Sequence, residues 1–118
     1  MDKKKRDHEA MMQGLNWWGI PTLFRCPYNS DSEGCDIALV GVPHSTGNGT
    51  TERDQHMGPR AVRNISALGR RTHLKYKLDP WNICEIRDLG DVPLPEANNN
   101  EKCIEHITDF YKRIAENK

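Results

Sequence analysis

The distribution of apolar and polar positions predicts two short strands. Residues 37–42, IALVGV, form a continuous apolar run between Asp36 and Pro43, which is typical of a strand buried on both faces of a parallel sheet. A shorter apolar pattern predicts a second strand at residues 83–88. Because a helical pattern separates the two runs, we expect an α/β fold with a right-handed strand–helix–strand unit.

The helix between the strands follows Gly58 and Pro59, which suit its N-cap and first position because proline there loses no hydrogen bond. Gly69 suits its end. Its apolar residues recur at helical spacing and form one stripe. They are Ala61, Val62, Ile65 and Leu68.

A second amphipathic helix is predicted at residues 101–116. Residues 98–100, three asparagines, are candidates for its N-cap, and Asn98 followed by Glu101 has the spacing of a capping box. The preceding segment, VPLPEA, contains two prolines and is therefore a connection rather than a central strand. The apolar face of the helix comprises Ile104, Ile107, Thr108, Tyr111, Ile114 and Ala115.

Residues 1–35 are predicted to be an N-terminal arm that precedes an α/β portion at residues 36–118. The arm begins with a charged, solvated segment and continues with an aromatic stretch that has no clear period. Its apolar residues either fasten the arm to the body or contact a neighbouring subunit. They are Trp17, Trp18, Ile20, Leu23 and Phe24.

Composition excludes several classes of protein. Seventeen basic and 17 acidic side chains balance, so the general attraction to phosphate shown by nucleic-acid binders is missing. No apolar run reaches the roughly 20 residues that span a bilayer, and no apolar region follows the basic start. We expect no nucleic-acid or membrane partner, and a cytoplasmic protein.

The apolar content is low, at 36% of residues with a mean hydropathy of −0.82, so we expect a small or incomplete core. A central parallel strand needs a neighbouring strand on each edge and helices over both faces of the sheet, and two strands and two helices are too few to provide them. The sequence therefore predicts either pairing with another chain or the leading piece of a longer protein.

The four cysteines, at positions 26, 35, 84 and 103, have no zinc-binding spacing and are expected to be free thiols. The long polar segment GVPHSTGNGTTERDQHM, residues 41–57, also lacks a complete motif. A dinucleotide fingerprint would need its third glycine at Glu52, and a P-loop would need a lysine. His44, Asp54 and His56 could bind a metal, but one loop gives them no rigid scaffold.

The position of this segment favours a functional role. Loops at the carboxyl ends of parallel strands line the ligand crevice, and this loop follows the first strand. Connections in such units usually take roughly 2 to 6 residues, so one of this length is more often functional or disordered.

The order of these segments resembles a known family. IALVGVP, the long polar loop, GPRAVRNIS, RDLGDVPLP and an amphipathic helix are together similar to the N-terminal part of the ureohydrolases, the arginase, agmatinase and guanidino-acid hydrolase family. The aromatic arm NWWGIPTLFRCPY is similar to the arm of agmatinase-like members. The resemblance implies a three-layer α/β fold with a parallel sheet, of which this chain supplies the first strand–helix–strand–helix portion.

The resemblance also implies an activity. Complete members are trimers or hexamers in which two Mn²⁺ or Ni²⁺ ions activate a hydroxide that attacks a small guanidino substrate and releases urea. Their metal ligands lie in Gly-Gly-Asp-His, Asp-Ala-His-x-Asp and Ser-x-Asp-x-Asp segments, and none of these segments occurs here. The resemblance therefore predicts no catalytic or metal-binding residue in this chain, which alone should be inactive.

In the family, the long loop helps to select the substrate tail. The candidate contacts here are His44, Asn48, Thr50 and Thr51, which can accept hydrogen bonds from a guanidinium group. Arg53 could pair with a substrate carboxylate. Ser45 stands where many agmatinases have aspartate, and ERDQHM where they have a glycine-rich Arg segment, so a shorter guanidino compound or a guanidino acid fits as well as agmatine.

Arg60, Arg63 and Asp91 are predicted to be structural, capping a helix and a turn. Two alternatives to the hydrolase remain. One is a non-catalytic assembly module that binds a partner chain through the arm and the open sheet edge. The other is a small nucleotide-binding protein, which the incomplete fingerprint disfavours.

Overall fold

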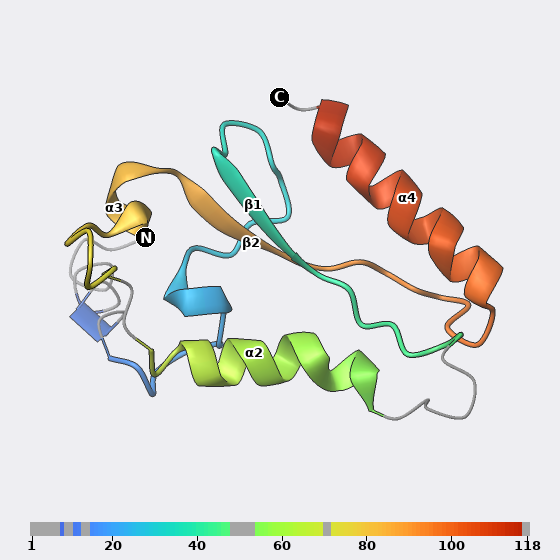
Figure 1. The fold of residues 1–118 in the computed structure, drawn as a ribbon, viewed down its shortest axis with the longest axis horizontal. Coiled ribbons are helices and arrows are strands. Elements are labelled where there is room, and N and C mark those ends of the chain that lie inside the picture. Colours follow the sequence, from blue (N-terminus) through green and yellow to red (C-terminus); the bar gives the residue numbers. More distant parts are fainter. Residues whose placement is uncertain (1–7, 9–10, 13–14, 48–53, 70–71, 117–118) are drawn as a thin grey trace.

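The computed structural model describes residues 8, 11–12, 15–47, 54–69 and 72–116. Its regular elements form a strand–helix–strand–helix series with short helical turns between them (Figure 1). The two strands, β1 (Ile37–Gly41) and β2 (Ile86–Asp91), form a parallel pair. The α/β fold class and the first predicted strand are thus confirmed.

The second strand begins three residues later than predicted. Asp79 accepts a hydrogen bond from the backbone N–H of Trp81 (2.9 Å) and caps a short helix, α3 (Pro80–Ile83). Ile83, expected to begin the strand, therefore ends this helix and is 71% exposed. Local capping outweighed the apolar pattern at this point.

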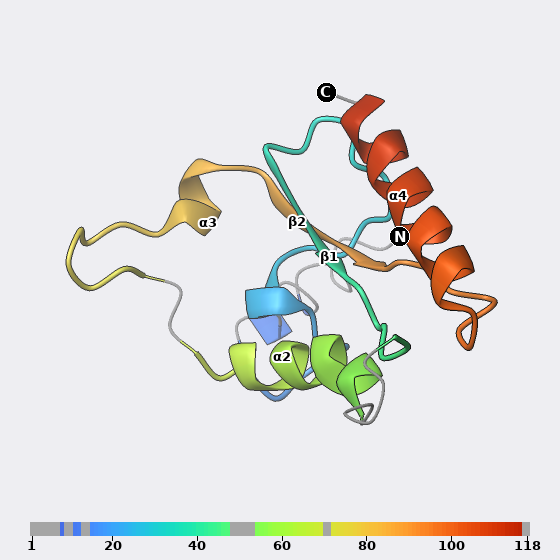
Figure 2. The ribbon, with the colours of Figure 1, turned by 45° about the vertical axis from the view of Figure 1, so that its right-hand side comes forward.

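The two long helices lie on opposite sides of the strand pair (Figures 1 and 2). They are α2 (Gly58–Ser66) and α4 (Asn100–Glu116). Pro59 lies in the first turn of α2, as predicted. Asn99, rather than Asn98, caps α4, because its side chain accepts the backbone N–H of Lys102 (3.2 Å).

The apolar stripe of α2 is turned away from the strands. Val62, Ile65 and Leu68 are exposed, with Ile65 at 66%. The helix instead presents Arg63 and Ser66 to the body, and it ends before the predicted stop at Gly69. A stripe of this kind ordinarily faces a core, so α2 has an apolar face that the described part of the chain does not cover.

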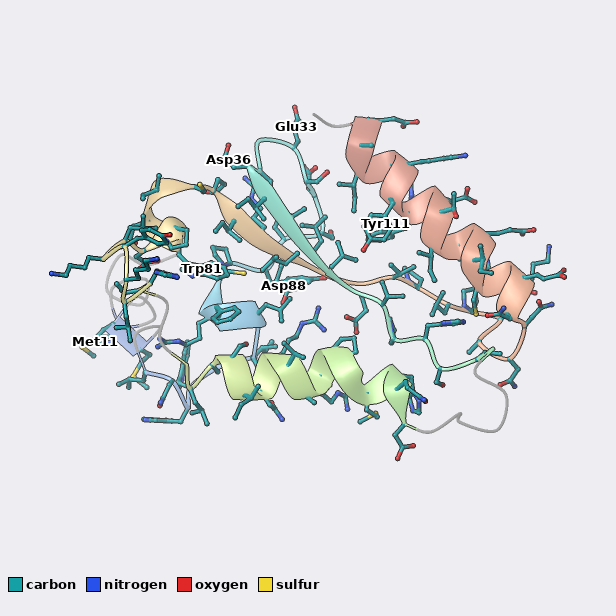
Figure 3. The ribbon with its side chains drawn as sticks, in the orientation of Figure 1. Met11, Glu33, Asp36, Trp81, Asp88 and Tyr111 are labelled. Carbon is teal, nitrogen blue, oxygen red and sulfur yellow. The ribbon has the colours of Figure 1, made fainter. Side chains whose placement is uncertain are left out.

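Part of the N-terminal arm packs on the body. Asn29 N–H donates to the Asp88 carbonyl (3.1 Å) and Asp88 N–H donates to the Pro27 carbonyl (2.9 Å), so the arm runs parallel to β2 along one edge. Phe24 lies within a 3-10 turn, η1 (Leu23–Arg25), and its ring centroid lies 5.1 Å from that of Trp81. Figure 3 shows Trp81 beside η1, and Asp88 between the strand pair and α2. The division at residue 35 remains a prediction.

The buried apolar core is small. Within the described residues its hydrophobic members are Cys26, Ala67, Ile86, Leu89, Val92 and Cys103. The radius of gyration is 16.7 Å, against about 13.5 Å expected for a compact domain of this length. Tyr111, on the apolar face of α4, is 46% exposed (Figure 3). The chain is therefore more open than a closed domain of the same size.

Candidate functional site

The candidate site is the segment between β1 and α2, residues 42–57, called here the β1–α2 connection. It leaves β1 at the carboxyl end of the strand, where parallel sheets bind ligands. Its last residues form a 3-10 turn, η3 (Gln55–Met57), that leads directly into α2. Residues 48–53 lie outside the described part of the chain.

The first part of the connection lies against the turn before α4. Thr46 Oγ1 donates a hydrogen bond to the Ala97 carbonyl. Gly47 has a φ of +98°, and a Cβ there would lie 2.8 Å from the Asn100 side-chain oxygen. Glycine thus allows both the left-handed backbone and the close approach. These contacts set the connection beside the start of α4.

The two ends of the connection meet at Asp91. Gly41, the last residue of β1, pairs in register with Asp91 and accepts a hydrogen bond from Val92 N–H (2.9 Å). A Cβ at Gly41 would overlap the Asp91 carboxylate and would lie 2.8 Å from Pro59 Cβ. Only glycine therefore fits where β1, β2 and the start of α2 converge.

Arg63 joins α2 to the end of β2 through three hydrogen bonds. Its Nε and NH2 groups donate to the two carboxylate oxygens of Asp88 (2.8 and 2.9 Å), in a bidentate pair. Its NH1 group donates to Asp91 Oδ1 (2.6 Å). Asp88 is 1% exposed, so this pair is buried, whereas Asp91 is partly in solvent.

Asp88 stays ionised because its hydrogen bonds outweigh its burial. Burial alone would raise the pKa of Asp88, but hydrogen bonds from Arg63 and from the Leu23 and Gly90 N–H groups leave this pKa below its ordinary value of 3.8. The hydrogen bond to Asp88 raises the pKa of Arg63, despite a smaller opposing effect of burial. Both groups are therefore charged across the physiological pH range.

The structure places only one of the predicted contact residues. His44 is half-buried, and its Nε2 atom has no hydrogen-bond partner within the described residues. The other candidates, Asn48, Thr50, Thr51 and Arg53, lie outside those residues, so their roles stay predictions. Beside His44, Ser45 Oγ lies 3.4 Å from the Nδ1 atom of His56 and links the two described parts of the connection.

Sequence reasoning missed Asp88 and misjudged its partners. Arg63 and Asp91 were predicted to cap a helix and a turn, but Arg63 instead donates hydrogen bonds to both Asp88 and Asp91. The segment RDLGD could have indicated Asp88 as a site residue, because it places two carboxylates at the end of a predicted strand. The partner of a buried carboxylate lies 25 residues away, however, and spacing alone does not identify it.

The site residues do not fit a metal ion. Across the part of the chain that the structure describes, no three His, Cys, Asp or Glu side chains are grouped closely enough to hold one. This includes His44, Asp54 and His56, which the sequence places on the same loop. The chemistry of the described residues is that of polar recognition rather than of metal coordination.

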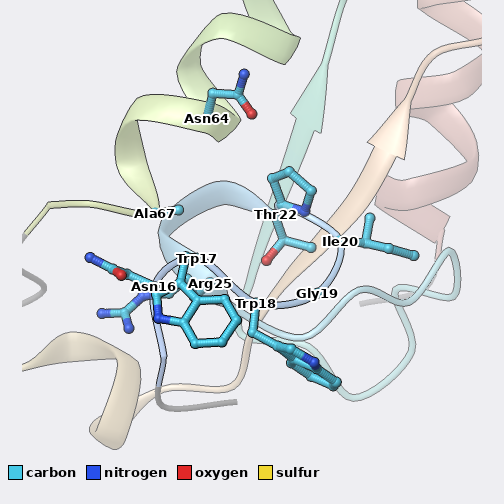
Figure 4. Close-up of a pocket in the computed structure, with 10 residues that line it drawn as sticks. Asn16, Trp17, Trp18, Gly19, Ile20, Thr22, Arg25, Asn64 and Ala67 are labelled. Carbon is cyan, nitrogen blue, oxygen red and sulfur yellow. The ribbon is translucent and has the colours of Figure 1, made fainter. Parts of the chain in front are cut away.

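The arm lines a hollow that lies apart from the connection. Figure 4 shows Trp17 and Trp18 beside a hollow of about 230 Å³, which Asn64 and Ala67 of the α2 segment also line. Trp17 is 71% exposed and Ile20 is 91% exposed.

No helix within the described residues has the length and apolar character needed to cross a bilayer.

Three comparisons with known proteins agree with this geometry. The model of the Arginase family matches residues 35–118. The chain is 33% identical over 96 residues to guanidinopropionase of Pseudomonas aeruginosa, a match that covers 81% of this chain and 30% of that protein. It is 30% identical over 97 residues to the mitochondrial agmatinase of Gallus gallus, with 82% and 28% covered.

Among solved structures, the chain is similar to proclavaminate amidinohydrolase of Streptomyces clavuligerus. The TM-score is 0.65 and the identity is 25%, over 82% of this chain and 33% of that one. The chain therefore spans about a third or less of the length of these relatives.

Proposed function

The chain belongs to the arginase family, and on that premise we propose that it is the N-terminal segment of an agmatinase-like ureohydrolase. The complete enzyme would hydrolyse a small guanidino compound to urea and an amine. The observation that carries this proposal is the family match over residues 35–118, with a long polar connection at the carboxyl end of β1 within the matched region.

The chain's own part in the reaction would be recognition of the substrate. His44, Asn48, Thr50 and Thr51 would accept hydrogen bonds from the guanidinium group. The unpaired Nε2 atom of His44 supports this role, because a half-buried nitrogen without a partner gains most from a donor. Arg53 would pair with the carboxylate of a guanidino acid.

The metal ions would be held elsewhere. Two Mn²⁺ or Ni²⁺ ions, which the family resemblance implies, do not fit the described residues, and we assign no step of hydrolysis to this chain. Their ligands would come from the part of an arginase-family body that this chain does not span. That part would also cover the exposed stripe of α2 and pair with the second edge of β1.

A second candidate function is a non-catalytic module that binds another subunit. The exposed Trp17 and Ile20 of the arm favour it, since exposed aromatic groups mark interfaces. The two functions are compatible if the complete enzyme is a homo-oligomer, either a trimer or a hexamer. A cytoplasmic location remains a prediction from the sequence; some relatives carry mitochondrial names.

A fusion protein tests the hydrolase directly. In it, this chain replaces the 96-residue segment of the Pseudomonas guanidinopropionase to which it aligns. Purified with Mn²⁺, the fusion should release urea from 3-guanidinopropionate, 4-guanidinobutyrate or agmatine. A fusion that is folded, loaded with metal and inactive on all three would contradict the proposal, and the guanidinopropionase itself serves as the positive control.

A further inference from the structure

The two ends of the β1–α2 connection are held close together by contacts at Gly41 and Asp91. Gly41 ends β1, and both the Asp91 carboxylate at the end of β2 and Pro59 in the first turn of α2 lie beside it. The connection therefore leaves the body and returns to it at one point. A shift of Asp91 would move both ends of the connection at once.

Asp91 itself is fixed by Arg63. The guanidinium group donates to Asp91 Oδ1 at 2.6 Å through NH1, and its Nε and NH2 groups donate to the buried carboxylate of Asp88. Asp88 is oriented in turn by N–H groups of Leu23 and Gly90, at 3.0 and 2.9 Å. A continuous chain of hydrogen bonds thus runs from the Leu23 and Gly90 backbone through Asp88 and Arg63 to Asp91, which lies beside Gly41.

We propose that Gly41, Arg63 and Asp91 form a clasp that positions the described ends of the β1–α2 connection, residues 42–47 with His44 and residues 54–57, and so determines which guanidino tails the enzyme accepts. The specificity part of this proposal rests on the proposed function. These three are positioning residues, because they act on the substrate only through the connection. Recognition is sensitive to this kind of positioning, since one methylene in a hydrophobic pocket changes discrimination between substrates by about 10- to 200-fold.

Two other contacts of the connection are weaker than the clasp. Ser45 and His56 are separated by 3.4 Å, and Thr46 is bound through a single neutral hydrogen bond to the Ala97 carbonyl. A charged hydrogen bond is worth roughly twice a neutral one. Loss of the clasp should therefore move the connection more than loss of either of these two contacts.

The structural test uses the 118-residue chain itself and Asp91→Asn. Amide exchange of residues 42–47 and 54–57 should become about tenfold faster, because one charged hydrogen bond at the base is weakened. Asp36→Asn is the matched control. Asp36 accepts a hydrogen bond from Glu85 N–H (2.7 Å) at the other end of the same strand pair, so its loss should leave these amides unchanged. Equal exchange in both variants would overturn the clasp.

The functional test uses the same substitutions in the fusion protein, with Arg63→Lys as the variant that keeps the charge. Asp91→Asn should change the ratio of KM values for 3-guanidinopropionate and 4-guanidinobutyrate by about fivefold, with kcat within about twofold. Arg63→Lys should shift the ratio less. A parallel fall in kcat for both substrates would indicate a merely structural role and overturn the specificity part. If the unsubstituted fusion is inactive, the proposed hydrolase function and the specificity part of this proposal are both contradicted. The amide-exchange measurement then tests the positioning role of the clasp separately.

Discussion

Replacing Arg63 by methionine is the sharpest test of how the chain is held together. The substitution keeps most of the side-chain volume but removes all three hydrogen bonds to Asp88 and Asp91. It leaves the carboxylate of Asp88, which is 1% exposed, without its counter-ion. Removing one member of a buried ion pair costs about 3–5 kcal/mol.

The structure places the expected cost at the lower end of that range. Asp88 keeps the two backbone N–H groups of Leu23 and Gly90, which support its charge. The lost bond to Asp91 adds about 1 kcal/mol or less, because Asp91 is partly exposed. Natural domains are stable by about 5–15 kcal/mol, and the small core here favours the low end, so a loss of about 3 kcal/mol should leave little stability.

The assay is urea unfolding followed by circular dichroism, on the chain and on the fusion protein. Arg63→Lys, which keeps the charge but not the bidentate geometry, should lose about 1–3 kcal/mol. Arg60→Met is the control, since Arg60 lies one turn earlier on the exposed side of α2 and should change stability by less than about 0.5 kcal/mol. An Arg63→Met protein as stable as the Arg60→Met control would refute the reasoning.

Three further predictions concern single contacts. In a thermal melt, Gly41→Ala should destabilise the chain by about 1–3 kcal/mol, since its Cβ would overlap the Asp91 carboxylate. Gly58→Ala, the control, has open space around the new methyl group and should be neutral or stabilising in the same assay. Asn99→Ala should cost about 1 kcal/mol by removing the cap of α4, seen as faster amide exchange in its first turn, while Asn98→Ala should have no effect. The pKa of Asp88 is lower in the folded chain, so its stabilising effect is complete above its ordinary pKa of 3.8 and is lost as the pH falls below it; an Asp88→Asn protein should show a flatter acid-unfolding curve, and identical curves would contradict the assignment.

Local patterns were sufficient to predict β1 and α4. The apolar run at residues 37–42 and the helical spacing of residues 101–116 are each complete within one element. The start of β2 was misplaced because the Asp79 cap, which holds Ile83 in α3, competes with an apolar pattern that says nothing of capping. The sequence thus predicted elements that one local pattern determines. It did not predict the start of β2, where a helix cap and an apolar pattern compete.

Contacts between distant segments were beyond the sequence. Periodicity finds the apolar stripe of α2, but it does not say that Ile65 is exposed or what covers it. The pairing of Arg63 with Asp88 depends on how α2 docks on β2, which spacing does not fix. The position of the candidate loop followed from the strand order, whereas the contacts of Asn48, Thr50, Thr51 and Arg53 remain predictions.

The central claim is that this chain is one part of a larger arginase-family body, with β1 inside the complete sheet. Amide exchange of β1 (Ile37–Gly41), measured in the isolated chain and in the fusion with the guanidinopropionase remainder, tests it most directly. The account predicts that amides of β1 not bonded to β2 exchange quickly in the isolated chain and become protected in the fusion, because a new parallel strand pairs with them. Equal protection of β1 in the two proteins would contradict it.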